Sequence, residues 1–293
     1  MNIALFSAYD QAVTVEYALA IHKIVQNQGH QIWIDQRLQK HFERAECAAD
    51  FFDSSQSMKQ DFDVLFSVGG DGTLLRAIPF VYDSGVPILG INTGRLGFLT
   101  SLQKESLEKG LELFFKGSYE LVSRSLIHIQ TEPRVDAIED FGYALNEVTL
   151  IRKNSTAMLR IDSQVNNKQL TNYWADGLIV ATPTGSTGYS LSNGGPILTP
   201  ETECFVLNPI APHNINIRPL ILPDTAKIQL SVEGRGTHHL VSMDARMLSV
   251  PMHTKILLQK APFQIQTIQI HGDDFFQTLR NKLFWGHDPR NRQ

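Results

Sequence analysis

A glycine-rich turn holds the residues of this chain that are best suited to phosphate chemistry. Residues 64–75 read VLFSVGGDGTLL, in which an apolar run is followed by Gly-Gly-Asp-Gly at 69–72 and by a helical pattern from Thr73. Backbone N–H groups in such a turn can converge on a phosphate. A carboxylate repels phosphate, so Asp71 indicates a base or orienter for a hydroxyl group that receives a phosphoryl group. The alternative is that Gly-Asp-Gly only makes a tight turn.

Two shorter motifs carry side chains that could contact a nucleotide. Residues 92–98 (NTGRLGF) follow an apolar strand pattern at 86–91, where a doubly wound sheet presents its ligand-binding edge. Phe98 could stack on a flat ring there, or it could be an ordinary core phenylalanine. Asn146 and Glu147 could together grip vicinal ribose hydroxyls, although an Asn-Glu pair is usually solvated surface.

The stretch 173–197 contains an unusual density of small hydroxyl residues. Asp176 precedes an apolar strand pattern, which opens into residues 182–192, a segment rich in Thr, Ser and Gly. Backbone N–H groups and hydroxyls of such a loop suit a ligand that carries phosphate and ribose groups. The alternative is a purely structural loop.

Several missing patterns narrow the chemistry. The chain has no Gly-x-x-x-x-Gly-Lys-Ser/Thr and no Gly-x-Gly-x-x-Gly, so neither a P-loop nucleotidase nor a dehydrogenase-type dinucleotide site is indicated. Residues 185–188 (GSTG) are one residue short of a nucleophile elbow. The pair His238-His239 lacks a further ligand at useful spacing for a metal site.

Composition indicates an ordinary globular protein. The 293 residues are 42% hydrophobic and 19% charged, with a formal net charge of −4, which does not favour nucleic-acid binding. Cys47 and Cys204 form no disulfide or zinc pattern. The first residues lack a signal-peptide pattern and no apolar run is long enough to span a membrane, so we expect a cytoplasmic protein.

Strand-like and helix-like patterns alternate up to about residue 125. The expected strands are 3–7, 30–34, 63–68 and 86–91, and the expected helices are 14–28, 73–84 and 106–116. This alternation predicts a parallel sheet flanked by helices.

Beyond Tyr119 the chain reads as short β segments separated by turn residues. The expected strands are 143–152, 159–165, 169–174, 178–181, 227–232, 239–243 and 255–260. Residues 166–168 (Asn-Asn-Lys) are a hairpin signal, and 273–285 returns to helical spacing before Gly286. The pattern therefore predicts an all-β second domain.

Taken together, the motifs resemble those of the NAD kinase family. They occur in the family's order and spacing over nearly the whole chain: GGDGT at 69–73, NTGRLGFLT at 92–100, Asn-Glu at 146–147, the block 176–197, PIAPH at 209–213 and RPL at 218–220. The first motif also resembles lipid kinases and phosphofructokinases, whereas the block 176–197 is highly specific.

The resemblance implies a fold and an activity. The fold would be a Rossmann-like α/β N-terminal domain (1–122) and a mainly β C-terminal domain (123–271), as in NAD kinases and diacylglycerol kinases, with a C-terminal helix in 272–293 that packs back on the first domain. The activity would be ATP-dependent phosphorylation of the 2′-hydroxyl of the adenosine ribose of NAD, which gives NADP and ADP. We expect a homodimer or homotetramer, with no nucleic-acid or membrane partner.

The resemblance also assigns roles to residues. Asp71 matches the family's catalytic proton acceptor. Positions that bind NAD or ATP in the family match Gly72, Arg76, Phe98, Asn146, Glu147, Asp176, Thr187, Gly188, Tyr189, Ser190, Leu191, Ser192, Ala211 and Arg246. No residue is expected to be a metal ligand, because a divalent ion (Mg²⁺ or Mn²⁺) would arrive with the ATP phosphates.

One position departs from the family pattern. Several relatives carry an arginine two residues before the position of Asp176, where this chain has Trp174. Tryptophan cannot make bidentate bonds to phosphate, but it could stack on the nicotinamide ring.

Two other functions stay open: a kinase for lipids or sugars on the same catalytic motif, and a dinucleotide sensor without turnover. The hydroxyl-rich loop disfavours the first, and the intact motif around Asp71 disfavours the second.

Overall fold

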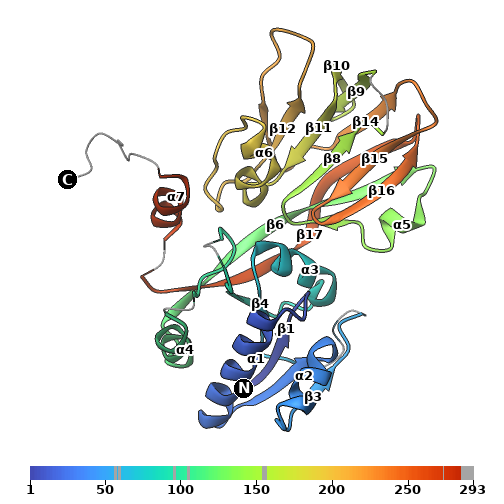
Figure 1. The fold of residues 1–293 in the computed structure, drawn as a ribbon. Helices are drawn as coiled ribbons and strands as arrows, with labels where there is room; N and C mark the ends of the chain where they lie inside the picture. Colours follow the sequence, from blue (N-terminus) through green and yellow to red (C-terminus); the bar gives the residue numbers. More distant parts are fainter. Residues whose placement is uncertain are drawn as a thin grey trace. The chain divides into compact units, whose positions relative to one another are not determined.

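The computed structural model describes residues 1–55, 58, 61–94, 97–103, 106–153, 157–272 and 274–284. The chain forms two compact units, coloured along the sequence in Figure 1. Unit 1 comprises Met1–Ser123 and Ile265–Gln293, and unit 2 comprises Arg124–Gln264. No helix of the described residues is long and apolar enough to cross a membrane.

Unit 1 is built on a parallel sheet. Its strands follow the order β5 (Ile88–Ile91), β4 (Val64–Val68), β1 (Asn2–Phe6), β2 (Gln31–Asp35) and β3 (Asp50–Phe52). A sixth strand, β17 (Lys255–Ile270), joins this sheet through Thr267, which pairs with Ile88. Every residue of β4 and of β5 is buried, because parallel strands are covered on both faces. The predicted parallel sheet is confirmed.

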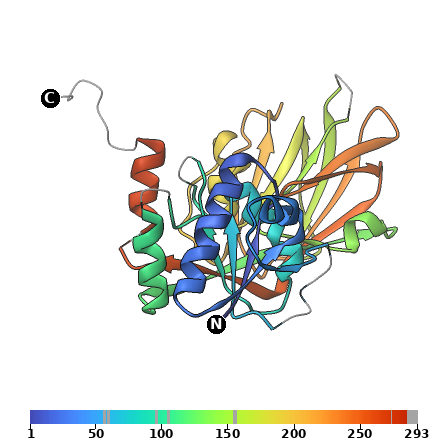
Figure 2. The ribbon, with the colours of Figure 1, turned by 60° about the horizontal axis from the view of Figure 1, so that its bottom comes forward.

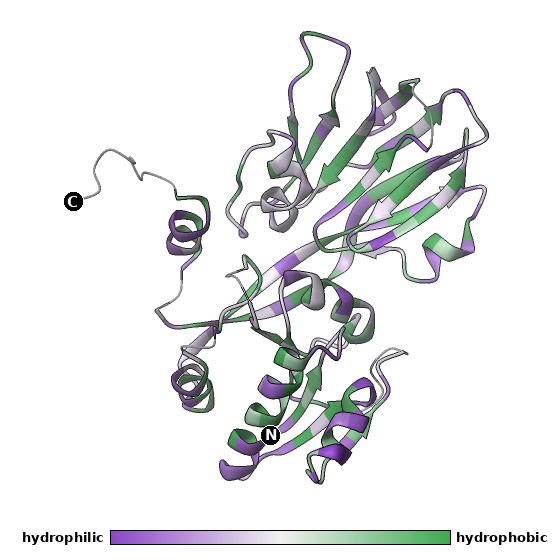
Figure 3. Ribbon diagram, in the orientation of Figure 1, coloured by the Kyte–Doolittle hydropathy of each residue, from purple (hydrophilic) through white to green (hydrophobic). Residues whose placement is uncertain are grey.

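Helices cover the sheet of unit 1. The helical segments are α1 (Ala12–Asn27), η1 (Gln36–Leu38), α2 (Gln39–Arg44), α3 (Asp71–Val81), α4 (Leu107–Phe115) and α7 (Phe275–Leu283). Buried residues of α1, such as Tyr17 and Ile21, form one cluster with strand residues and with α4, and Figure 2 shows α1 along the strands. Figure 3 shows both hydrophobic and hydrophilic residues along α1, as in an amphipathic helix that buries one face against a sheet.

Unit 2 is a β-sandwich. One sheet has the order β13 (Leu220–Pro223), β12 (Cys204–Ile210), β11 (Gly177–Ala181), β8 (Glu147–Ile151), β15 (His238–Met243) and β16 (Arg246–Pro251). The other sheet contains β10 (Lys168–Ala175), β9 (Leu159–Val165), β14 (Ile228–Glu233) and the first part of β17. Alternate residues of both sheets form one buried cluster.

Four short elements complete the description. They are β7 (Tyr143–Ala144), which pairs with β6 (Tyr119–Glu132), and the helical segments α5 (Asp136–Glu139), η3 (Thr184–Thr187) and α6 (Tyr189–Ser192). Residues near η3 and α6 cover the outer face of β11, where Leu198 packs against Ile179. For this reason β11 is buried on both faces although it belongs to an antiparallel sheet.

The hairpin predicted at 166–168 is confirmed. Strands β9 and β10 pair in antiparallel fashion around Asn166 and Asn167, whose φ angles are 51° and 60°. Asparagine tolerates positive φ better than most residues, and a two-residue turn of this kind matches the twist of the strands.

Other expectations differ from the structure. The helix expected from Thr73 begins at Asp71, so the carboxylate lies in the first turn. The strand expected over 143–152 is interrupted at residues 145 and 146. The long strands β6 and β17, and also α2, β3, β12, β13 and β16, were not predicted or were predicted only in part. The expected last helix is α7, but its expected limits, Asp273, Trp285 and Gly286, lie outside the described residues.

Candidate active site

Asp71 joins the two glycine-rich loops of unit 1. Its Oδ2 accepts a hydrogen bond from the backbone N of Phe98 at 2.8 Å, and its Oδ1 accepts one from the backbone N of Leu99 at 3.1 Å. The carboxylate also lies at the N-terminus of α3, where the helix dipole stabilises a negative charge. These bonds fix the direction of the carboxyl group and hold the loop 97–100 against the turn 69–72.

Glycines leave room for this arrangement. A Cβ atom on Gly97 would lie 1.9 Å from Oδ1 of Asp71, so a side chain at position 97 is incompatible with the observed carboxylate position. Gly69 has φ of +150°, and a Cβ there would lie 2.2 Å from Oγ1 of Thr73. At Gly72, by contrast, a Cβ would meet no described atom within 4 Å, so this side of the turn is open to an approaching group.

The loop after β5 is braced internally. Asn92 donates from Nδ2 to Oγ1 of Thr100 at 3.0 Å and accepts at Oδ1 from the backbone N of Gly94 at 2.7 Å. Phe98 is partly buried, and its ring centroid lies 6.3 Å from that of Phe275 on α7. Arg95 and Leu96 of the motif lie outside the described residues.

Arg76 lies on the exposed face of α3. Its guanidinium carbon is 5.6 Å from the centroid of the Tyr9 ring. The structure thus brings Asp71, Gly72 and Phe98 together, and it places Arg76 one helical turn further along the same helix.

In unit 2 the predicted pair Asn146-Glu147 is held by a carboxylate. Asp244 accepts backbone N–H bonds from residues 145–147 at 2.8, 2.8 and 3.2 Å. Asp244 itself has φ of 50° and lies in the tight turn between β15 and β16. Three successive N–H groups on one carboxylate explain the interruption between β7 and β8, because these groups bind a side chain in place of a neighbouring strand.

Glu147 lies in an environment that disfavours its charge. Burial, followed by the nearby charge of Asp244, raises the pKa of Glu147 to about 8, and the backbone N–H of Tyr189 opposes the shift. Within the described residues, Oε2 of Glu147 and Oδ1 of Asn146 are buried without a hydrogen-bond partner. Buried polar atoms usually have a partner, so the two unsatisfied oxygens indicate a place for polar groups of a ligand.

The hydroxyl-rich loop packs on this pair. A Cβ on Gly188 would lie 2.9 Å from Oε2 of Glu147, and one on Gly185 would lie 2.0 Å from the backbone O of Asn146. The two glycines therefore allow the close approach of the loop to residues 146 and 147.

Several hydroxyls of the loop are bonded within the protein. Thr182 donates to the backbone O of Leu145 at 2.6 Å, and Thr187 donates to the backbone O of Thr184 at 3.1 Å. The buried Ser190 accepts from Nδ2 of Asn208 at both its backbone O and its Oγ. Part of the hydroxyl density thus has a structural reason, as the alternative interpretation of this loop expects.

The remaining positions of the loop are more accessible. Tyr189 is 42% exposed, Ser192 is exposed, and Leu191 and Gly188 are partly buried. These residues stand at and around the short helix α6, beside Glu147.

Asp176, Ala211 and Arg246 occupy three other places in unit 2. Asp176 lies between β10 and β11, with its Oδ2 3.2 Å from a guanidinium nitrogen of Arg152. Ala211 follows β12 with φ of 45° and is exposed. Arg246 donates to the backbone O atoms of Phe141 and Tyr143, so in this structure its guanidinium braces the beginning of β7.

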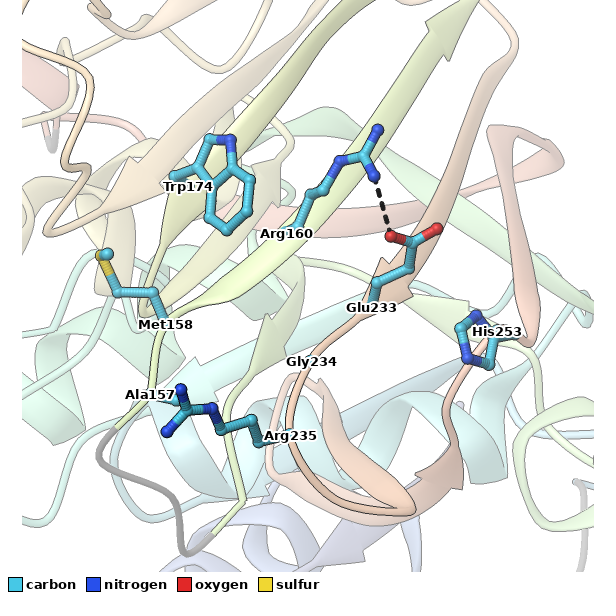
Figure 4. Close-up of a pocket in the computed structure, with 8 residues that line it drawn as sticks. All are labelled: Ala157, Met158, Arg160, Trp174, Glu233, Gly234, Arg235 and His253. Carbon is cyan, nitrogen blue, oxygen red and sulfur yellow. Dashed lines mark hydrogen bonds and ion pairs between the residues drawn. The ribbon is translucent and has the colours of Figure 1, made fainter.

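Trp174 lines a cavity of about 680 Å³ in unit 2 (Figure 4). It pairs in register with Arg160, which pairs in turn with Glu233, so the three side chains lie side by side across β10, β9 and β14. Nη1 of Arg160 and Oε2 of Glu233 are 3.0 Å apart. None of the predicted substrate-binding residues lines this cavity.

Three residues of the site were not predicted from the sequence: Asp244, Asn208 and Lys282, the last of which lies 3.8 Å from Asp71. Each acts on a segment distant in sequence, so local patterns do not indicate it. Within the described residues no group of three or more His, Cys, Asp or Glu side chains could hold a metal ion.

We expect the raised pKa of Glu147 to appear in the pH dependence of stability. Folding raises this pKa from 4.5 to about 8, so its contribution to stability is full below pH 4.5 and is lost as pH rises through 8. Glu147→Gln removes this titration, so the Tm of the variant relative to wild type should increase between about pH 5 and about pH 8. The exposed Glu120→Gln is the control for the same chemical change at a surface position. A constant difference for Glu147→Gln would contradict the burial of the carboxyl group.

Comparisons with known proteins agree with the motifs. The ATP-NAD kinase N-terminal domain matches residues 5–119, and the ATP-NAD kinase C-terminal domain matches residues 145–270. A protein named NAD kinase from Flavobacterium psychrophilum is 44% identical over 99% of this chain and 100% of its own length.

Two solved structures share the fold. Yeast NADH kinase complexed with NADH superimposes with a TM-score of 0.86 at 21% identity, covering 100% of this chain and 90% of its own. An NAD kinase from Archaeoglobus fulgidus in complex with ATP has a TM-score of 0.73 at 28% identity, covering 97% of this chain and 99% of its own. The full-length sequence match and both domain matches lead to one conclusion: the chain belongs to the NAD kinase family.

Proposed function

We propose that Asp71 is the proton acceptor of the reaction that this kinase catalyses. As an NAD kinase, the protein transfers the terminal phosphoryl group of ATP to the 2′-hydroxyl of the adenosine ribose of NAD, giving NADP and ADP. The lipid and sugar kinase alternative is thereby set aside. The observation that carries the proposal is the fixed carboxylate of Asp71, oriented by the N–H groups of Phe98 and Leu99 at the start of α3.

The proposed chemistry needs little more than positioning. Phosphoryl transfer passes through a loose transition state, so orientation and neutralisation of charge account for most of the catalysis. Asp71 would orient the 2′-hydroxyl in the ground state and take its proton as the new P–O bond forms and the bond to ADP breaks. Magnesium or manganese would arrive as part of the ATP substrate, since such an ion binds mainly through phosphate oxygens and water.

The proposed contacts with the dinucleotide and nucleotide follow the predicted residues. In unit 2, the buried unsatisfied oxygens of Asn146 and Glu147 suit the hydroxyl groups of a ribose. A protonated Glu147 can both donate and accept a hydrogen bond, as a hydroxyl group can. The other proposed contacts are Gly72, Arg76, Phe98, Asp176, Thr187, Gly188, Tyr189, Ser190, Leu191, Ser192, Ala211 and Arg246. We also propose a homodimer or homotetramer and a cytoplasmic location.

We expect Asp71→Asn to lose turnover with little change in fold. Asparagine is nearly isosteric and keeps one oxygen for the N–H bonds of Phe98 and Leu99, but it loses the second acceptor and cannot accept the proton. The kcat for NADP formation should fall by roughly 10²–10⁴-fold. Tm should fall by only about 2–6 °C, for the one N–H bond that asparagine cannot accept, and the affinity for NAD, measured by calorimetry, should change little. A variant that retains more than about a tenth of wild-type kcat would show that Asp71 is only a turn residue.

A second variant displaces the carboxylate without removing it. In Gly97→Ala the new Cβ would lie 1.9 Å from Oδ1 of Asp71, so the carboxyl group must move. We expect kcat to fall by at least about tenfold, because misplacement of a reacting group by an ångström is costly. Gly94→Ala in the same loop is the control, since its Cβ would lie 3.8 Å from the nearest atom, Oδ1 of Asn92. Equal activity of the two variants would argue against the proposed role of Asp71.

We further propose that Trp174 stacks on the nicotinamide ring. The oxidised ring is cationic, and cation–π attraction favours it over the neutral reduced ring. Trp174→Leu should therefore raise KM for NAD by roughly fivefold or more, with a smaller effect on KM for NADH and little change in kcat. Leu170→Ala, at an exposed position of the same strand, serves as control. Unchanged KM values for both dinucleotides would refute the stacking.

A further inference from the structure

The last helix of the chain presents one face to the loop that holds Asp71. On α7, Phe275, Leu279 and Lys282 follow the spacing i, i+4, i+7, which places them on the same side of the helix. Leu279 is buried, and Phe275 contacts Phe98. The helix begins with a capped turn in which Asp274 accepts from the backbone N of Gln277 at 2.6 Å.

Lys282 ends this face beside the proposed catalytic carboxylate. Its Nζ lies 3.8 Å from Oδ2 of Asp71 and 4.6 Å from the centroid of the Phe98 ring. The Lys282 side chain is 35% exposed and that of Asp71 is 27% exposed, so both remain accessible to a ligand. Among the described residues, Lys282 is the one cation paired with Asp71.

The position of Lys282 reduces the repulsion between the Asp71 carboxylate and a phosphoryl group that binds near it. Asp71 must be negatively charged to accept a proton, yet it stands where the charged phosphoryl group of ATP has to come close. Arg76, the basic residue of the predicted site in unit 1, is directed to the ring of Tyr9. An ammonium group within 4 Å of the carboxylate offsets the repulsion and offers N–H donors to phosphate oxygens.

We propose that Lys282 is a catalytic residue of the phosphoryl transfer, delivered to the site by the C-terminal helix. Its ammonium group contacts the phosphoryl group during transfer. As the 2′-oxygen forms its bond to phosphorus and the bond to ADP breaks, the proton of the hydroxyl passes to Asp71. The carboxylate thereby loses its charge, and Lys282, which keeps its own proton, pairs with the phosphate oxygens instead. This inference rests on the proposed role of Asp71.

The test compares Lys282→Met with Arg280→Met in the purified full-length protein. Both changes remove a positive charge from the last turns of α7, but Arg280 is exposed and is not on the face of Phe275 and Leu279. With magnesium-ATP and NAD, we expect Lys282→Met to lower kcat by roughly 10–100-fold and Arg280→Met by less than about twofold. Lys282→Arg, which restores the charge, should recover most of the lost kcat. The Tm values of all three variants should agree with that of wild type within about 2 °C.

The outcomes separate this inference from the proposed function. Normal kcat in Lys282→Met, together with inactive Asp71→Asn, would overturn the role of Lys282 alone. Normal kcat in Asp71→Asn would overturn the role of Asp71 itself. A loss in Lys282→Met that Lys282→Arg does not recover would also overturn the inference, because a packing role would then explain the loss. In the double variant Asp71→Asn, Lys282→Met, we expect a smaller additional loss than Lys282→Met causes alone, since the two groups act on the same step.

Discussion

The carboxylate of Asp71 and two backbone N–H groups of the neighbouring loop make the contact on which the site of unit 1 depends. The donors, on Phe98 and Leu99, follow Asp71 by 27 and 28 residues, so a single side chain joins the ends of two neighbouring strands, β4 and β5. Charge-assisted hydrogen bonds of this kind are stronger than neutral ones. They fix the direction of the carboxylate at the N-terminus of α3.

In unit 2 a carboxylate also accepts backbone N–H bonds from a segment distant in sequence. Asp244 accepts three N–H bonds and sets the position of Asn146 and Glu147. Burial raises the pKa of Asp244, whereas these three bonds and the nearby Arg246 lower it. The carboxyl group of Glu147, in contrast, has its pKa raised to about 8 by burial and by Asp244. Two acidic residues in one unit thus differ in role: Asp244 holds the backbone, and Glu147 is the one that we propose contacts a ligand.

Much of the fold could be predicted from the sequence, because local patterns reflect local burial. Strands such as β4 and β5 are largely apolar and fully buried because both faces are covered. The long strand β6 could not be predicted in this way, since exposed, partly buried and buried residues mix along its 14 residues. The interruption at residues 145 and 146 also has no local signal, because its cause, Asp244, lies almost a hundred residues later.

The residues around Asp71 could also be predicted only in part from the sequence. Motif resemblance predicted Asp71, Phe98 and the pair at 146–147 as site residues, since these residues lie in short, specific patterns. It did not identify Lys282, which approaches Asp71 from a helix 211 residues further along the chain. Contacts of this type depend on topology. Spacing along the sequence does not encode them.

Unit 1 contains residues from both ends of the chain, which affects the order in which its core can form during synthesis. Ile268 and Ile270 of β17 belong to the buried cluster formed by β1, β4 and α1, and Leu279 of α7 is buried as well. The ribosome makes the first 123 residues of this unit long before these residues, with the whole of unit 2 in between. Residues 1–123 therefore cannot complete the core of unit 1 until the end of the chain is made. Unit 2 is continuous in sequence, so it can complete its own core first.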